Sequence, residues 1–164
     1  MVDSGNNLLY NIIIKRKEGK VSMYFSGEQT HQLDSKNRIR IPAKYKSEIS
    51  EKLVFSKGVN PCIYVLPYSK YAEMVDKFDK LPPFAQDVQL AISAYMSTFE
   101  VLEEDNQGRI LLPQSLLDHA GIKKDVVTVG VKDRLEIWGV EKREEVLGSK
   151  SFEDFMSILS DRLS

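Results

Sequence analysis

The sequence predicts an α+β fold in which one small, mostly β unit occurs twice and helices join and follow the two copies. A ten-residue pattern recurs at an interval of 71 residues, and both occurrences carry the chemistry of a tight turn. Two helical segments lie between the occurrences, and the apolar residues of the C-terminal tail keep helical spacing. An interval this long indicates a duplicated domain and not a solenoid of many units.

The repeated pattern covers residues 33–42 in the first copy and 104–113 in the second. The likeness extends downstream, where residues 53–56 match 126–129 and residues 63–66 match 135–138 as β-like runs. Four residues recur in register within the pattern: Asp34, Arg38, Ile39 and Pro42 match Asp105, Arg109, Ile110 and Pro113.

Each pattern contains the residues of a tight hairpin turn. An aspartate begins a turn by accepting hydrogen bonds from backbone amides that follow it, which predicts this role for Asp34 and Asp105. Asn37 and Gly108 occupy the same place in the two copies, and both residue types tolerate a positive φ. We therefore expect these four residues to shape two equivalent turns.

After the turn, each copy is expected to continue with a short strand, a short helix and two more strands. Pro42 and Pro113 suit the first position of helices over residues 43–50 and 114–119, and Gly121 suits the end of the second. Turn-forming residues at 58–61 and 131–133 separate the last two strands of each copy.

The remaining segments are predicted to be helical. Between the copies, residues 69–80 and 84–96 form two helices, broken at Leu81-Pro82-Pro83, and the C-terminal apolar residues keep helical spacing on one face. The expected organisation is an N-terminal extension at 1–22, a first copy at 27–69, a helical linker at 70–97, a second copy at 98–142 and a C-terminal helical tail at 143–164.

Charge distinguishes the two copies although the net charge of the chain is only −1. Residues 33–46 contain five basic residues and one acid, whereas residues 100–113 contain four acids and one base. Opposite charge on matched segments indicates that the copies have different tasks. Basic side chains alternate around the first turn, which favours contact with phosphates or bases of nucleic acid.

The composition excludes several other classes of protein. No apolar run approaches the length needed to span a bilayer, and the basic residues follow the apolar stretch 8–14 instead of preceding it as in a secretory signal. Cys62 is the only cysteine, so no intrachain disulfide forms, and a cytoplasmic location is expected. No acid or cysteine lies at metal-ligand spacing from His31 or His119, so we expect no metal site.

Catalysis has no support in the residues. The chain has no glycine-rich phosphate loop and no recognisable pair of nucleophile and base. We expect no catalytic residues, no cofactor and no small-molecule substrate.

The residues resemble the MraZ family. Residues 25–28 and 31–43 are similar to the opening of MraZ proteins, and residues 105–110 and 135–138 are similar to their second repeat. The resemblance extends from Met23 to about Leu147. It is specific because the Asp-x-x-x-Arg pattern occurs twice, each time followed by Ile and Pro at matched spacing.

The resemblance implies a fold, a partner and an assembly. Each copy is expected to be a half-barrel of the SpoVT-AbrB type, and the two half-barrels interlock as swapped hairpins into a β-barrel. The family forms rings, here expected to be octamer-like, and binds double-stranded DNA at direct repeats upstream of the division and cell-wall gene cluster, usually as a repressor, at the nucleoid. The DNA-contacting loop of the family implies this role for Lys36, Arg38 and Arg40 and, more weakly, for Arg109.

Three features depart from the family pattern. Asn37 replaces the usual glycine, the linker helix at 84–96 lacks the arginines common there, and residues 1–22 have no counterpart. We expect Met23 to be the true start, because Lys17-Glu18-Gly19 can be encoded by a purine-rich ribosome-binding sequence. An intact mass of the native protein that includes residues 2–22 contradicts this hypothesis.

Two alternatives stay open at this point. The first is that Arg38 and Arg109 pair with Asp34 and Asp105 as structural salt bridges, which the acidic neighbours favour most for Arg109. The second is a ring-forming interaction protein with little affinity for DNA, which the nearly neutral charge and the missing linker arginines allow.

Overall fold

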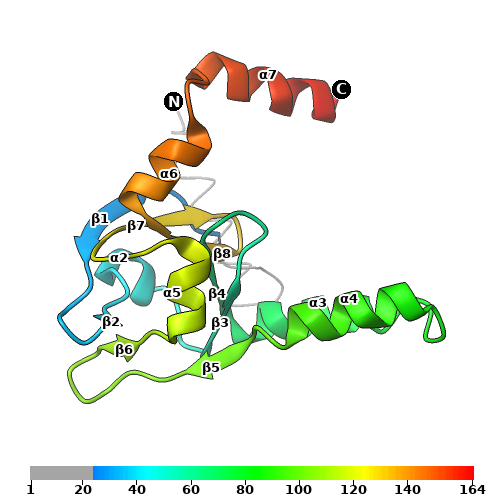
Figure 1. The fold of residues 1–164 in the computed structure, drawn as a ribbon, viewed down its shortest axis with the longest axis horizontal. Helices are drawn as coiled ribbons and strands as arrows, with labels where there is room; N and C mark the ends of the chain where they lie inside the picture. Colours follow the sequence, from blue (N-terminus) through cyan, green and yellow to red (C-terminus); the bar gives the residue numbers. More distant parts are fainter. Residues whose placement is uncertain (1–23) are drawn as a thin grey trace, which may run out of the picture.

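Two antiparallel sheets carry the fold in the computed structural model, which describes residues 24–164 (Figure 1). The extension at 1–22 and the start at Met23 lie outside the described residues. The first copy contains β1 (Glu28–Gln32), β2 (Arg38–Ile39), α2 (Ala43–Lys46), β3 (Leu53–Lys57) and β4 (Ile63–Pro67). The second contains β5 (Glu100–Leu102), β6 (Ile110–Leu111), α5 (Gln114–Ala120), β7 (Asp125–Val131) and β8 (Arg134–Gly139).

The strands of the two copies are interleaved in the six-stranded sheet, whose order is β1-β7-β8-β4-β3-β5. The first strand of each copy pairs with the third strand of the other, as β1 with β7 and β5 with β3. The fourth strands pair with each other, with Tyr64 opposite its matched residue Glu136. The copies are therefore related by an approximate two-fold rotation, and neither forms its sheet alone.

A separate two-stranded ribbon joins the second strands of the two copies. In this pairing of β2 with β6, Ile39 lies opposite its matched residue Ile110, so the same two-fold relation passes through the ribbon. The mixed α+β class predicted from the sequence is confirmed. In residues 24–164 the eight strands form these two sheets and no single closed barrel, with β1 and β5 as the outer strands of the larger sheet.

The main core lies between one face of the six-stranded sheet, the ribbon and the short helices. Alternation of side chains along a strand places every second residue on this face, so β4 contributes Ile63 and Val65, both fully buried. Ile39 and Ile110 of the ribbon are 1% and 0% exposed. The opposite face of the sheet carries a smaller cluster of Cys62, Tyr64, Val127 and Trp138.

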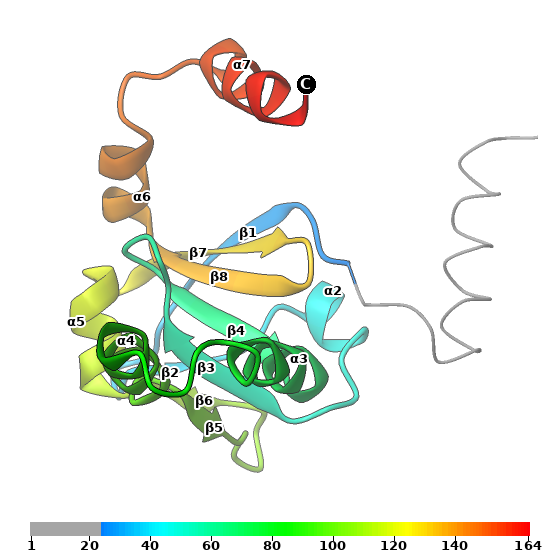
Figure 2. The same cartoon turned by 90° about the vertical axis from the view of Figure 1, so that its right-hand side faces the viewer.

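The helices between and after the copies extend away from the sheets (Figures 1 and 2). The linker contains α3 (Tyr68–Phe78) and α4 (Gln86–Met96), which form a hairpin with Phe78 and Tyr95 in edge contact at 6.3 Å between ring centroids. Two helices, α6 (Val140–Leu147) and α7 (Phe152–Leu163), follow β8. Many apolar side chains of α7 are exposed, among them Phe152 and Leu163.

The short helices start at the predicted residues, Ala43 and Gln114, but end differently. Pro42 and Pro113 adopt extended backbone angles, with ψ of 136° and 143°, so each is the N-cap and not the first helical residue. The expected helix over residues 43–50 is shorter, because α2 ends at Lys46. Gly121 ends α5 in the left-handed conformation with φ of 60°, as its residue type predicts.

Candidate nucleic-acid interface

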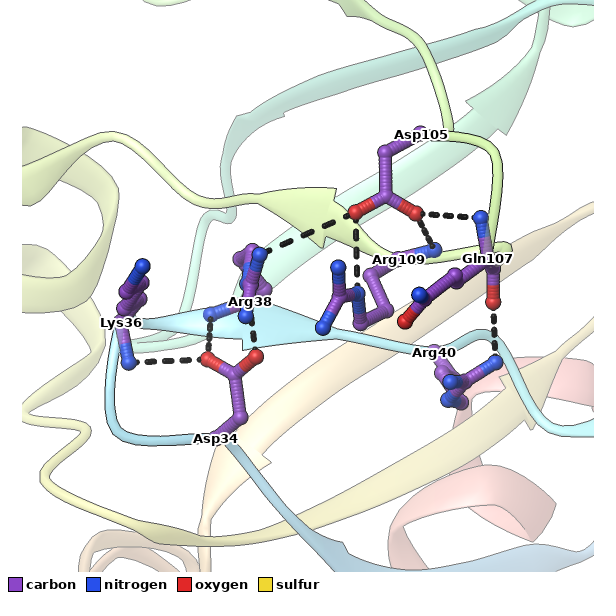
Figure 3. A network of polar contacts seen from close by, with 7 residues as sticks. All are labelled: Asp34, Lys36, Arg38, Arg40, Asp105, Gln107 and Arg109. Atoms are coloured by element: carbon purple, nitrogen blue, oxygen red, sulfur yellow. Dashed lines mark hydrogen bonds and ion pairs between the residues drawn. The ribbon is translucent and has the colours of Figure 1, made fainter.

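The two Asp-x-x-x-Arg turns, 71 residues apart in the chain, form one surface (Figure 3). The ribbon places them together, because β2 follows the first turn, β6 follows the second, and the two strands are antiparallel. The first turn spans residues 34–38 and the second spans residues 105–109.

The first turn is held by the carboxylate of Asp34. Its Oδ1 accepts hydrogen bonds from the backbone amides of Lys36 and Arg38, both at 2.9 Å. Its Oδ2 accepts from Arg38 Nε at 2.6 Å. The backbone closes the turn, since Asp34 N donates to Arg38 O and Asn37 N donates to Asp34 O.

The second turn repeats this arrangement. Asp105 Oδ1 accepts from the amides of Gln107 and Arg109 at 2.8 and 2.9 Å, and Oδ2 accepts from Arg109 Nε at 2.9 Å. Asn37 and Gly108 both have a positive φ, 60° and 76°, at matched positions. Identical bonding at two places separated in sequence shows that the pattern itself specifies the turn.

The hydrogen bonds also set the charge of the two aspartates. The backbone amide of Arg38 holds the pKa of Asp34 below its ordinary value of 3.8, and the side chain of Arg38 acts in the same direction. The backbone amide of Arg109 lowers the pKa of Asp105 in the same way. Both carboxylates are therefore ionised at neutral pH, and each stabilises its turn in that form.

Acid is expected to loosen both turns. A carboxyl group whose pKa is lowered by folding contributes stability above its unfolded pKa, and that stability is lost as the pH falls through the folded pKa. We expect the backbone amides of Lys36 and Arg38 to keep constant NMR shifts from neutral pH down to about 5 and to move below about 4. Asp34→Asn should remove this titration at the first turn and leave that of Gln107 and Arg109 unchanged; an unaltered acid transition at Lys36 would contradict the assignment.

Both arginines of the pattern are paired with aspartate. Arg38 bonds Asp34 and lies 3.9 Å from Asp105 through Nη1, and its side chain is 23% exposed. Arg109 bonds Asp105, with 25% of its side chain exposed. The salt bridge that the acidic neighbours favoured for Arg109 is thus present at both turns. Arg38 lies between the two aspartates, so it helps to hold the turns together.

The other predicted cations lie around the same surface. Lys36 and Arg40 are exposed, and Arg40 Nη1 donates to the backbone oxygen of Gln107 in the second turn. A groove of about 570 Å³ runs beside the turns. It is lined by both arginines of the pattern and by Arg40, Lys46, His31 and Gly108, among others.

Ion pairs across the copies were not foreseen from the sequence. Lys46 of α2 pairs with Glu104, and Lys52 lies 3.9 Å from Glu103. The opposite charge of the matched segments was the available signal. It did not show which residues meet, because that depends on how the two copies pack.

Other chemistry has little support within residues 24–164. No group of three His, Cys, Asp or Glu side chains in this part of the chain is placed to hold a metal ion. His31 Nε2 bonds Thr128 Oγ1 at 2.7 Å, and His119 Nε2 donates to backbone oxygens of the 58–60 loop. Cys62 is buried, and burial raises the pKa of its thiol to about 12. None of the helices described here is long and apolar enough to cross a membrane.

Comparison with known proteins gives one consistent result. The family described as "MraZ protein, putative antitoxin-like" matches residues 24–91 and 95–160. A protein of Clostridium tetani named Transcriptional regulator MraZ is 40% identical over 121 residues, which are 74% of this chain and 85% of that protein. Proteins of the same name from Clostridium beijerinckii and Finegoldia magna are 41% and 37% identical, covering 82% and 84% of this chain and 93% and 97% of their own lengths.

Proposed function

The chain belongs to the MraZ family, and from this membership and the paired turns we propose that it is a DNA-binding transcription regulator. The observation that carries the proposal is the ribbon of β2 and β6, which places two Asp-x-x-x-Arg turns and their cations on one surface. A two-stranded ribbon fits the major groove of B-DNA, where side chains reach the base edges. Arg38 and Arg109 of the two turns favour contact with phosphate and guanine, since each of these groups offers acceptors to a guanidinium.

The first turn makes the main DNA contacts in this proposal. Lys36 and Arg40 are exposed beside it, and Arg38 lies between them along the chain. Arg109 contributes less, because Glu103 and Glu104 precede its turn and repel phosphate. Asp34 and Asp105 with Asn37 and Gly108 keep the turns in shape and need not touch DNA.

The finer family properties complete the proposal. The exchange of first strands between the copies supports interlocking SpoVT-AbrB half-barrels that together approximate a barrel. The exposed apolar residues of α7 support association into a homo-oligomeric ring, octamer-like in size, because monomers rarely leave such surfaces uncovered. We propose that the ring binds direct repeats upstream of the division and cell-wall gene cluster as a repressor at the nucleoid.

An interaction protein with little DNA affinity is the second candidate. It is favoured by one observation, which is that three of the cations near the turns, Arg38, Lys46 and Arg109, are already paired with carboxylates of the same chain. In that case the ring binds a protein partner through its helices. Neither candidate involves catalysis.

Retardation of a duplex separates the two candidates. The duplex is taken from upstream of the chain's own gene and is compared with a random-sequence duplex at several salt concentrations. A regulator is expected to retard its own duplex more strongly, with an affinity that falls as salt rises. Light scattering on the same samples is expected to give a mass of several chains. Absence of any shift at low salt eliminates the DNA-binding proposal and leaves the interaction protein.

A further inference from the structure

Three charged side chains converge on Gly108 in the second turn. A methyl group placed on Gly108 would lie 3.6 Å from Arg40 Nη1, 3.7 Å from Lys46 Nζ and 3.8 Å from Glu104 Oε2. The two cations come from the first copy, whereas the glycine and the carboxylate come from the second. Arg40, Lys46 and Gly108 line the groove beside the turns, and Glu104 lines a neighbouring pocket that also contacts Lys46.

Glu104 occupies the position that an external anion would take beside Arg40, Lys46 and Gly108. Lys46 Nζ donates to Glu104 Oε2, and Arg40 Nη1 donates to the nearby backbone oxygen of Gln107. The side chains of Lys46 and Glu104 are 48% and 29% exposed, so another anion has access to the lysine. A carboxylate oxygen and a phosphate oxygen form the same kind of charge-assisted hydrogen bond with lysine or arginine.

We propose that Arg40, Lys46 and Gly108 form a phosphate site for the DNA backbone, and that Glu104 fills it in the free protein as an internal competitor. This inference rests on the proposed function, because the phosphate belongs to bound DNA. A backbone phosphate displaces the Glu104 carboxylate from Lys46, and only hydrogen bonds and counterions are exchanged. Lys46 is thereby a DNA-contacting residue in addition to those of the turn.

The site exists on only one side of the approximate two-fold axis. At the interval of 71 residues that relates the copies, Arg40, Lys46 and Glu104 match Leu111, Leu117 and Leu33. Leucine binds no phosphate, and of the three only Leu111 is exposed. This phosphate site therefore has no counterpart beside the first turn, and the resulting asymmetry gives the bound chain a direction along the duplex.

Two substitutions test the competition. Glu104→Gln keeps the shape of the side chain but removes its charge, and should tighten binding to a random-sequence duplex roughly 2- to 5-fold, as expected for release of one exposed ion pair. Lys46→Met should weaken binding to the same duplex, and should reduce the slope of log affinity against log salt by about 1, as expected for the loss of one phosphate contact. Phosphate contact does not depend on base sequence, so the upstream duplex should respond equally.

The double variant distinguishes competition from simple repulsion. If Glu104 competes for Lys46, then Glu104→Gln should give much less gain in the Lys46→Met background. An equal gain in both backgrounds would mean that Glu104 only repels DNA through space, and would overturn the proposal. Lys52→Met and Glu103→Gln are the matched controls, since neither side chain is among the three groups nearest Gly108. Lys52→Met should leave the salt slope unchanged, and any gain from Glu103→Gln, which repels phosphate only through space, should be the same in the Lys46→Met background.

The same measurements distinguish a failure of the proposed function from a failure of this inference alone. If the parent protein retards no duplex, the proposed function fails and this inference fails with it; if the parent binds and Lys46→Met binds equally well with an equal salt slope, only this inference fails. Titration with inorganic phosphate at constant ionic strength, followed at the Gly108 amide, tests for a small-anion site. Saturation by phosphate alone together with no effect of Lys46→Met on duplex binding would overturn the backbone assignment.

Discussion

Arg38→Ala is expected to abolish measurable binding to the upstream duplex while the protein stays folded. A guanidinium that reads a guanine is worth roughly 1–3 kcal/mol per contact, or about 5- to 150-fold in affinity. Every subunit of a ring presents the same turn, so the losses multiply over the engaged sites. Titration of the specific and random-sequence duplexes, with thermal unfolding of each variant, measures the two effects separately.

The contacts of Arg38 require a control for its structural role. Because Arg38 bonds Asp34 at 2.6 Å, its removal also loosens the turn, and some loss of thermal stability is expected. Asp34→Asn weakens the same pair but leaves the guanidinium in place. If Arg38 contacts DNA, Asp34→Asn should retain most of the binding that Arg38→Ala loses.

Arg109→Ala provides the second comparison. Arg109 has the same local bonds as Arg38 but lies beside two acids, and its loss should therefore reduce affinity less. Equal binding by the parent and a folded Arg38→Ala protein would refute the role of the first turn. A larger effect of Arg109→Ala would instead place the main contact in the second copy.

Local chemistry explains which parts of this structure were predictable. The turns could be predicted because an aspartate, a residue that tolerates positive φ and an arginine act within five consecutive residues. The repeat was visible in the sequence for the same reason, since each copy must contain all three residue types of the turn. Both turns in the structure have the same bonds, so equal local sequence produced equal local geometry.

The pairing of strands that are distant in the sequence could not be predicted from the residues themselves. Nothing in residues 28–32 indicates that β1 pairs with β7 of the other copy and not with a strand of its own. The partner of Lys46 depended on that packing, as did the crowding of Arg40 and Glu104 around Gly108. The starts of the two short helices were predictable, but Pro42 and Pro113 are their N-caps and not the first helical residues that the preference of proline for that position suggests.

Truncation of the buried side chains in the ribbon that carries the turns should strongly reduce the stability of the fold. Ile39 and Ile110 lie opposite each other on the approximate two-fold axis and are almost fully buried. Truncation of a buried isoleucine to alanine costs about 2–5 kcal/mol, a large part of the ~5–15 kcal/mol that stabilises a typical domain. We expect Ile110→Ala to lower the free energy of unfolding by an amount in this range, measured by urea denaturation.

Leu111 supplies the matched control, since it is the next residue of the same strand and is 61% exposed. Leu111→Ala should change stability by no more than about 0.5 kcal/mol. The double variant of Ile39 and Ile110 should cost less than the two single variants together, because each truncation removes contacts from a shared part of the core and the second meets a cavity already opened. Costs that add to within about 0.5 kcal/mol would show that the two side chains act independently. If they are coupled as expected, loosening either strand disturbs both turns at once, and Ile39→Ala should weaken DNA binding although the Ile39 side chain is only 1% exposed.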